Sequence, residues 1–180
     1  MPTAGAEHNR KKATGAVKDT LARARPGCDV KGAENTMHVA TILREKGSDV
    51  VTIEPERTIA ETAKLLDRHR IGAVLVLGAD GSVAGVLSER DIVRGVARHG
   101  EGALAMAVGD LMTRDVIVCE PKDTVQDVMG LMTHRRIRHV PVVENGRLAG
   151  IVSIGDVVKG RLGVVEMEAE SLRAYVQGAF

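Results

Sequence analysis

A short motif whose residues could bind an anion occurs twice in the chain. In each copy a glycine and two apolar residues lead to a serine, and an aspartate follows three residues later, giving Ser88 with Asp91 and Ser153 with Asp156. An apolar-periodic segment comes next, so the motif is typical of a strand that runs into a helix. A helix N-terminus offers free backbone N–H groups and the positive end of the helix dipole, which suits phosphate.

The same spacing is also typical of an ordinary helix cap. In a capping box, the serine hydroxyl accepts a hydrogen bond from the amide three residues on, and the acidic side chain accepts one from the serine amide. Because this short motif is common, it does not by itself distinguish capping from ligand binding. The repeat that surrounds it is more informative.

The composition limits the kinds of ligand and partner. Tyr175 and Phe180 are the only aromatic residues, so we expect an aliphatic core, and a bound base would lie between aliphatic side chains. Aromatic stacking platforms for single-stranded nucleic acid are thereby excluded. The net charge of +1 gives the chain no large field of one sign.

Cysteine and histidine usage predicts neither a disulfide framework nor a metal site. Cys28 and Cys119 fit no framework, and His69, His134 and His139 have no metal-ligand spacing with a cysteine or an acid. Such cysteine usage suits a reduced compartment. No apolar run approaches the length of a membrane span or of a secretory signal. We therefore expect a cytoplasmic protein without membrane contact.

Residues 1–36 are basic, rich in Ala and Gly, and lack a sustained apolar face. We expect a disordered N-terminal extension. Two alternatives stay open: the segment binds an anionic partner such as nucleic acid, or Met37 is the biological start of the protein.

The chain from Val50 onward is a duplication, because residues 50–95 align with residues 116–160. Each half is predicted to contain strand, helix, strand, strand and helix. The strands around 50–53 and 116–119 are β-branched runs. Threonine caps open the first helices, turn residues join the next two strands, and the second helix follows the serine. The caps are Thr58 with Glu61 and Thr124 with Asp127, and the turns are Gly78–Gly81 and Asn145-Gly146.

One half alone, at roughly 50 residues, is too small to bury a core comfortably. We therefore expect an α/β (α+β) fold in which two β-α-β-β-α units pack with pseudo-twofold symmetry around a cleft. The first unit, with its lead-in segment, is placed at 37–104 and the second at 108–163. The lead-in Met37–Leu43 corresponds to Val108–Met112, and the longer first linker has Lys46-Gly47-Ser48 as its expected surplus.

Residues 164–180 are expected to form a C-terminal amphipathic helix. Its apolar positions Val165, Ala169, Leu172 and Val176 recur at helical spacing, with glutamates between them. Such a helix needs a partner surface, on the core or on a second subunit. The acidic polar face disfavours a membrane.

These features together resemble a tandem pair of CBS domains, the Bateman module, over about Met37–Gly163. The resemblance lies in the order of elements and in the Gly-h-h-Ser-x-x-Asp motif (h for apolar) that closes each half. The segments Leu-Met-Thr-x-Asp-Val from Leu111 and Arg-His-Val-Pro-Val from Arg138 are similar to segments of small stand-alone bacterial CBS-pair proteins.

The resemblance implies a regulatory protein without catalytic activity, whose cleft binds an adenine nucleotide such as AMP, ATP or NAD and senses cellular energy state. It also implies a homodimer and an unidentified regulated protein. By position, Asp91 and Asp156 would bind the ribose hydroxyls, and Ser88 and Ser153 would approach phosphate. Apolar residues would enclose the base: Val50, Val51, Ile71, Ala73, Val116, Ile117, Ile137 and Val140.

The two half-sites are predicted to differ. Arg90 in the first motif adds a phosphate contact that the second motif lacks. The second half instead has Arg138, His139 and Pro141 in and beside its middle strand, whereas its Arg136 has a counterpart in Arg70 of the first half. The basic cluster His134–His139 has three interpretations: a solvated helix end, a phosphate contact in the cleft and a nucleic-acid contact, of which the last is the least favoured. One dinucleotide or two unequal mononucleotides fit this asymmetry.

Two other classes of function have weaker signals in the sequence. An enzyme would need a nucleophile with its base, paired carboxylates or a metal cluster, and none stands out. The alternative to a nucleotide sensor is a CBS protein that regulates a partner or binds nucleic acid through its basic segments.

Overall fold

A computed structural model describes residues 10–12, 22–23 and 36–177 of the chain. The chain divides into two compact units. Each unit mixes helices with strands, as expected for an α+β fold. The first unit contains Asp49–Val116, Asn145–Leu148 and the strand at 10–12, and the second contains residues 36–48, Ile117–Glu144 and 149–177.

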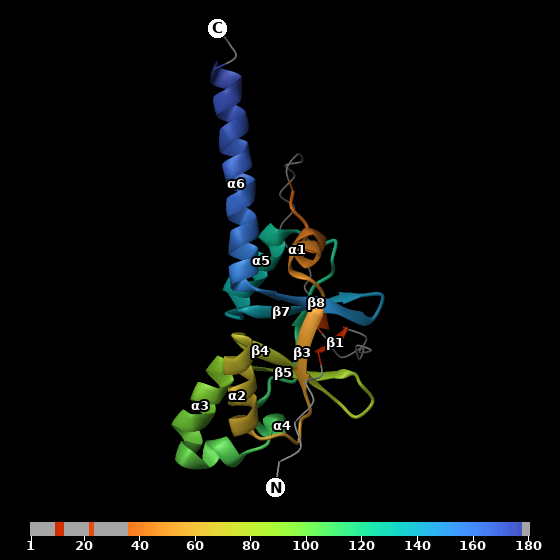
Figure 1. Ribbon diagram of the computed structural model, residues 1–180, viewed down its shortest axis with the longest axis vertical. Helices are drawn as coiled ribbons and strands as arrows, with labels where there is room; N and C mark the ends of the chain where they lie inside the picture. Colours follow the sequence, from red (N-terminus) through yellow and green to blue (C-terminus); the bar gives the residue numbers. More distant parts are fainter. Residues whose placement is uncertain (1–9, 13–21, 24–35, 178–180) are drawn as a thin grey trace. The chain divides into compact units, whose positions relative to one another are not determined.

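The sheet of the first unit has the order β1-β3-β4-β5 (Figure 1). Strand β3 (Asp49–Ile53) runs parallel to β4 (Ala73–Leu77), and β4 pairs antiparallel with β5 (Val83–Ser88). Helix α2 (Ile59–His69) makes the crossover between the parallel strands, and α3 (Glu89–His99) follows β5. The strand-helix-strand-strand-helix order is therefore present as predicted. A 3₁₀ helix, η1 (Gly100–Ala105), and the short α4 (Val108–Leu111) complete the unit.

Two pieces of the N-terminal segment are strands. Strand β1 (Arg10–Lys12) pairs antiparallel with β3, and a second short strand, β2, covers Ala22–Arg23. Backbone pairing along the edge of a sheet needs no apolar face in the added strand, so these five residues can be strands although the segment lacks an apolar face. The rest of the expected disordered extension, apart from Thr36, lies outside the described residues. Cys28 lies outside the described residues.

The second unit contains α1 (Val39–Lys46), β6 (Ile117–Val118), α5 (Val125–Arg135), β7 (His139–Glu144), most of β8 (Arg147–Ser153) and α6 (Ile154–Gln177). Its elements follow the same order as in the first unit. Helices α5 and α6 lie side by side (Figure 1). Strands β7 and β8 form a hairpin, and the next residue after β6, Cys119, bridges to Val142 in parallel.

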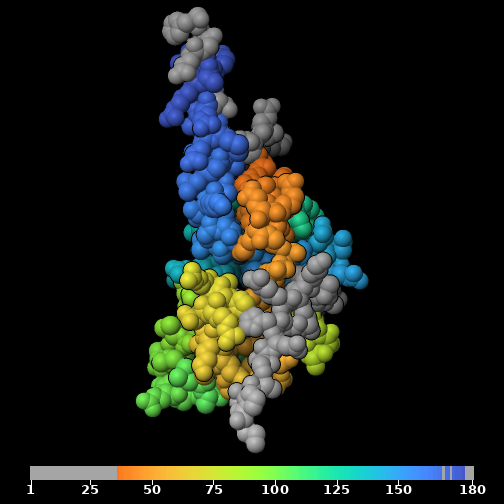
Figure 2. All heavy atoms as spheres, in the orientation of Figure 1, coloured from red at the N-terminus to blue at the C-terminus, as the bar shows by residue number. Residues whose placement is uncertain are grey.

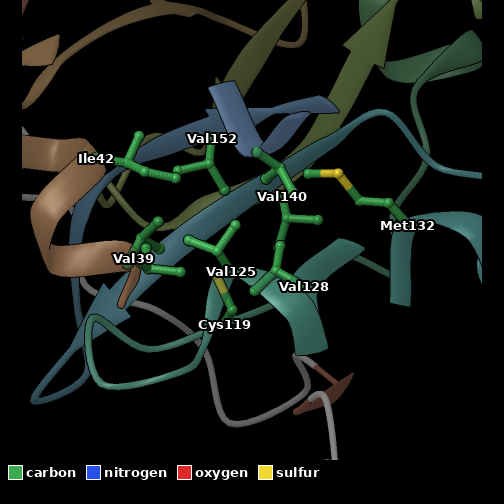
Figure 3. Packing of buried hydrophobic residues seen from close by; sticks show 10 residues of the cluster. Val39, Ile42, Cys119, Val125, Val128, Met132, Val140 and Val152 are labelled. Atoms are coloured by element: carbon green, nitrogen blue, oxygen red, sulfur yellow. The ribbon is translucent and has the colours of Figure 1, made fainter. Parts of the chain in front are cut away.

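The cores of both units are aliphatic, as the composition predicts. In the first unit Ile59, Leu66, Val74 and Leu87 pack together with Val108. In the second, Figure 3 shows Val39 and Ile42 from α1 packed against residues of α5, β7 and β8. Burial of these side chains stabilises each unit by roughly 1.5–3 kcal/mol per large residue.

Local signals placed most helix starts and turns correctly. The Thr58 hydroxyl accepts the Glu61 N–H, and the Glu61 carboxylate accepts the Thr58 N–H at 2.9 Å. Thr124 caps α5 through the Asp127 N–H at 3.0 Å. The Asn145-Gly146 turn has positive φ at both residues, 50° and 74°, which is the backbone that a type I′ hairpin requires.

Each lead-in segment packs with the other half of the sequence. The α1 residues Val39 and Ala40 donate to the carbonyls of Asp123 and Pro121, and α1 belongs to the second unit. Val108 and Gly109 of α4 donate in the same way to Arg57 and Pro55 in the first unit. Sequence order predicts that the lead-in Met37–Leu43 belongs to the first domain, whereas its backbone hydrogen bonds and apolar side chains lie in the second unit.

Helix α6 is one continuous helix of 24 residues. The sequence instead predicts that the second helix of the repeat ends near Gly163 and that a separate helix covers 164–180. A single helical glycine costs only about 1 kcal/mol relative to alanine, so Gly163 does not stop the helix. Within the described ranges, each helix is too short or too polar to span a lipid bilayer.

Candidate functional site

The first motif lies where β5 passes into α3. Ser88 is the N-cap of α3, and its N–H and hydroxyl both donate to Oδ2 of Asp91, at 3.0 and 2.6 Å. The Glu89 N–H donates to the carbonyl of Gly72 at 3.0 Å, which ties the start of the helix to the residue before β4. These contacts fix the Asp91 carboxylate against the helix N-terminus.

The second motif repeats this arrangement at the start of α6. Oδ2 of Asp156 accepts the N–H and the hydroxyl of Ser153, both at 2.8 Å, and the Asp156 N–H donates to Ser153 Oγ at 3.2 Å. The Ile154 N–H donates to the Arg138 carbonyl at 2.8 Å. Both motifs are therefore capping boxes, and capping orients each carboxylate in the same way.

Lys46 gives the second motif a partner that the sequence reading missed. Its Nζ donates to Asp156 Oδ2 at 2.6 Å and to the carbonyl of Ile151 at 3.3 Å. The sequence predicts Lys46 as surplus linker, but it is the last residue of α1. The only signal was a basic residue at the end of a linker that is longer than its counterpart.

The environment of Asp156 favours its charged form. Partial burial raises the pKa of this carboxyl, but the hydrogen bonds from Lys46 and Ser153, together with the ammonium charge of Lys46, outweigh it. The pKa therefore lies below its usual value. An ionised carboxylate with two oxygens can accept about four hydrogen bonds, and the three described here reach Oδ2 alone.

The glycine that opens each motif allows a close approach by the lead-in segment. A Cβ on Gly85 would lie 2.7 Å from Met112 Sδ and 2.8 Å from the Thr113 carbonyl oxygen. A Cβ on Gly150 would lie 2.7 Å from Leu43 Cδ2. Val86 and Thr113 exchange backbone hydrogen bonds beside Gly85. Glycine is thus needed at both positions for packing, so its presence in both motifs has a structural cause.

The residues expected to enclose a base differ in how accessible they are. Val140 is completely buried in the core of the second unit. Val50, Ala73 and Val116 are also buried. The half-buried members of the set are Val51 and Ile71, on the core of the first unit, Ile137, on the core of the second, and Ile117.

The basic residues beside the motifs are largely exposed. Arg90 lies in the first turn of α3, and Arg138 immediately precedes β7. Arg136 ends α5 in the left-handed conformation, with φ 55°, which disfavours a side chain with a Cβ. His139 is half-buried, and Pro141 is buried with its carbonyl accepting the Cys119 N–H.

Cys119 belongs to the core of the second unit. It is 2% exposed, and burial together with the nearby Asp123 raises the pKa of its thiol to about 12. Such a thiol is not a nucleophile at neutral pH. Among the described residues, no three His, Cys, Asp or Glu side chains are grouped closely enough to hold a metal ion.

Comparison with known proteins gives the following matches. The family model "CBS domain" matches residues 39–98 and 108–163. A crystal structure of the CBS-domain-containing protein ATU1752 from Agrobacterium tumefaciens is 47% identical, with a TM-score of 0.70, over 74% of this chain and 99% of that one. It is a small protein of the kind that the sequence resembles.

Two further solved structures contain ligands. The CBS domain protein PAE2072 from Pyrobaculum aerophilum, complexed with AMP, is 30% identical, with a TM-score of 0.59, and the match covers 67% of this chain and 89% of that one. The CBS domain pair of protein MJ0100, in complex with 5′-methylthioadenosine and S-adenosyl-L-methionine, is 27% identical, with a TM-score of 0.63, over 71% and 98% of the two chains.

Proposed function

Because this chain belongs to the CBS-domain family, we propose that it is a regulatory protein that binds an adenosine-containing ligand and catalyses no reaction. An adenine nucleotide, AMP, ATP or NAD, is our first choice of ligand. Support comes from the relatives solved with AMP and with methylthioadenosine and S-adenosylmethionine, because these ligands share adenine and a ribose ring with vicinal hydroxyls. The proposed recognition therefore begins at the ribose and the base.

The observation that carries the proposal is the matched geometry of Asp91 and Asp156. In both, the serine N–H and hydroxyl hold Oδ2 at 2.6–3.0 Å. This leaves Oδ1 to accept from the two vicinal hydroxyls of a ribose. Hydrogen bonds to an ionised acceptor are about twice as strong as neutral ones, and a carboxylate held in place loses little freedom when the ligand binds.

The hydroxyls of Ser88 and Ser153 are less suited to phosphate than we first expected, because each already donates its proton to the aspartate. We assign phosphate instead to basic side chains, namely Arg90 in the first unit and Arg136 and Arg138 in the second. The base would rest on half-buried apolar residues, Val51 and Ile71 or Ile117 and Ile137. His139 and Pro141 belong to the same region of the second unit.

The regulatory step would follow from differential binding. A ligand shifts a conformational equilibrium only by as much as its affinity differs between the two states. We propose that this shift changes the affinity of a cytoplasmic homodimer for a regulated protein. Energy sensing would follow if AMP and ATP bind with different affinities.

Calorimetric titration of the full chain with AMP, ATP, NAD, S-adenosylmethionine and 3′-deoxy-AMP tests the proposal. We expect AMP to bind and 3′-deoxy-AMP to bind roughly 10- to 100-fold more weakly, since a hydrogen bond to a charged group contributes about 1.5–3 kcal/mol. Asp91→Asn and Asp156→Asn should reduce the AMP affinity by a similar factor while keeping an acceptor for the cap. Asp110→Asn, at an exposed residue of α4, is the matched control.

Two outcomes contradict the proposal. If none of these ligands binds or raises the melting temperature, the chain is not an adenosine sensor. If 3′-deoxy-AMP binds as tightly as AMP, the aspartates do not recognise the ribose. Binding of S-adenosylmethionine but not of AMP, ATP or NAD would keep the adenosine site and reject the nucleotide assignment.

A further inference from the structure

Helix α6 has two apolar stripes, and only one of them is covered by its own unit. Val157 is buried in the core to which α1 and α5 contribute, and Val164, two turns further along the same face of the helix, is also buried. The second stripe is exposed, with Leu162 56%, Leu172 66% and Val176 63% accessible. Its members are Val158, Leu162, Val165, Ala169, Leu172 and Val176, of which Ala169 alone is half-buried.

The spacing of the exposed stripe is that of a coiled coil. Its residues follow one another at intervals of four, three, four, three and four from Val158 to Val176. This is the a and d pattern of a heptad, with a period of 3.5 residues, and it is sustained over nearly three heptads. Leu162, Ala169 and Val176 take position a, whereas Val158, Val165 and Leu172 take position d.

The second half of α6 has little to stabilise it within its own chain. From Val165 to Val176 every side chain that the structure describes is exposed, except the half-buried Ala169. Figure 1 shows α6 continuing beyond α5 and α1, and Figure 2 shows it, in blue, extending past α1, in orange, on that face. A helical segment of about a dozen residues is marginal in water by itself, and its apolar stripe needs a partner.

The charges beside the stripe favour a second copy of the same helix. Arg161 occupies position g and Glu166 position e. In a parallel pair, position g of one helix faces position e of the other helix five residues further on, so Arg161 would face Glu166 of the partner subunit. The sequence repeats the relation one heptad later, with glutamate at 168 and arginine at 173. Charge pairs at e and g set the partner and the orientation of coiled coils.

We propose that α6 pairs with α6 of a second copy as a parallel, in-register coiled coil over residues 158–176. Helices that face each other in this way bury the a and d residues in a shared seam while Val157 and Val164 remain in their own unit. The proposal does not depend on ligand binding. It chooses between the two partner surfaces that the sequence left open for this helix, the core and a second subunit, and assigns the exposed stripe to the second subunit.

Disulfide cross-linking tests this pairing directly. In a Cys28→Ser background, Leu172→Cys places a thiol at position d, where the two copies meet in a parallel, in-register pair. Ala174→Cys places one at the exposed position f of the same turn and is the matched control. At about 10 µM protein, mild oxidation should cross-link Leu172→Cys roughly 100-fold faster, because the paired thiols have an effective concentration near 1 mM.

Charge reversal tests the orientation in the same assay. Arg161→Glu and Glu166→Arg should each slow cross-linking of Leu172→Cys by roughly fivefold, given the modest energies of exposed ion pairs. A mixture of the two variants should cross-link preferentially between unlike chains, since both pairs are then attractive. Circular dichroism confirms that α6 remains helical in each variant.

Several results would overturn the proposal. Equal cross-linking at 172 and 174 would show that the thiols meet by chance collision. Absence of both cross-links would show that α6 is unpaired or antiparallel. If the charge reversals do not change the rate of cross-linking at 172, the assigned contacts between positions e and g are wrong. Binding of anionic phospholipid vesicles that is lost in Leu162→Ser, without cross-links, would assign the stripe to a membrane instead.

Discussion

Lys46 Nζ lies 2.6 Å from Oδ2 of Asp156, across 110 residues of sequence. The lysine ends α1, and the aspartate opens α6 in the same unit. The pair therefore joins the lead-in segment to the motif on which we base ligand binding. Asp91 accepts from Ser88 as Asp156 accepts from Ser153. The contact with Lys46 therefore makes the surroundings of the two aspartates unequal.

Replacing Lys46 by methionine should raise the pKa of Asp156. The hydrogen bond and charge of Lys46 hold this pKa below its usual value, whereas partial burial opposes them. Titration of the carboxylate by carbon-13 NMR would measure the change. Lys122→Met removes an exposed lysine that pairs with Glu120, and it should leave the pKa of Asp156 unaltered. No rise in Lys46→Met would contradict the contact.

The same pair predicts how stability depends on pH. A carboxyl whose pKa is lower in the folded state contributes stability above its unfolded-state pKa, and the contribution is lost as the pH falls through the folded-state pKa. The difference in unfolding free energy between wild type and Lys46→Met should therefore be largest at neutral pH. It should shrink in acid below the usual aspartate range. Urea denaturation at several pH values measures this difference. A difference in unfolding free energy that stays the same in acid would rule out linkage to Asp156.

Gly85→Ala should be more destabilising than Gly150→Ala. The new Cβ at 85 would lie 2.8 Å from a backbone carbonyl oxygen, whereas at 150 its nearest neighbour is the end of the flexible Leu43 side chain. Overpacking of this kind costs about 1–3 kcal/mol, and we expect Gly85→Ala in the upper half of that range. Gly130→Ala, in α5 with open space around it, should instead stabilise by up to about 1 kcal/mol. Thermal unfolding of the three variants ranks them.

What could be predicted from the sequence depended on the range of the interaction. Thr58 and Thr124 cap their helices, and Asn145-Gly146 forms its turn, because these structures are set by residues within four positions of one another. The contact of Lys46 with Asp156 and the packing of α1 in the second unit depend on distant parts of the chain. No local pattern could reveal them. The expected boundary at Gly163 shows the opposite error, since the chain continues through this glycine as one helix, α6.

The aspartates and serines of the two motifs were identified from spacing, and their mutual contacts are as a capping box requires. Their proposed role in binding came from the resemblance, because a cap and a ribose site use the same residues. The sequence also could not indicate that Val140 would be completely buried, since a β-branched residue in a middle strand can face either side of it.

Cys119 should resist alkylation in the folded protein. Its burial, and the acidic residues near it, raise the pKa of the thiol to about 12, so little thiolate exists at pH 8. In a Cys28→Ser background, iodoacetamide labelling should follow global unfolding and accelerate in urea with the unfolding transition. Rapid labelling at pH 8 without urea would show that this part of the core opens locally.

Arg70→Gly should stabilise the protein, because Arg70 ends α2 in the left-handed conformation with φ 53°. That conformation costs a residue with a Cβ about 1–2 kcal/mol, and glycine largely avoids this cost. Allowing for the entropy of glycine in the unfolded chain, we expect a gain of roughly 0.5–1 kcal/mol. Arg68→Gly, within the last turn of the same helix, should lose stability by a similar amount. Chemical denaturation distinguishes the two.

Arg136 has the same strained backbone at the end of α5, with φ 55°. If its guanidinium binds phosphate, as we propose, an arginine is kept at this position for ligand binding although its backbone conformation is strained. Arg136→Gly should then weaken AMP binding by roughly 10-fold or more, the effect of losing a hydrogen bond between charged groups, while adenosine binding stays unchanged because adenosine has no phosphate. Calorimetric titration with both ligands measures the two effects. Equal losses for AMP and adenosine would place Arg136 at the nucleoside, and no loss for either would remove it from the site.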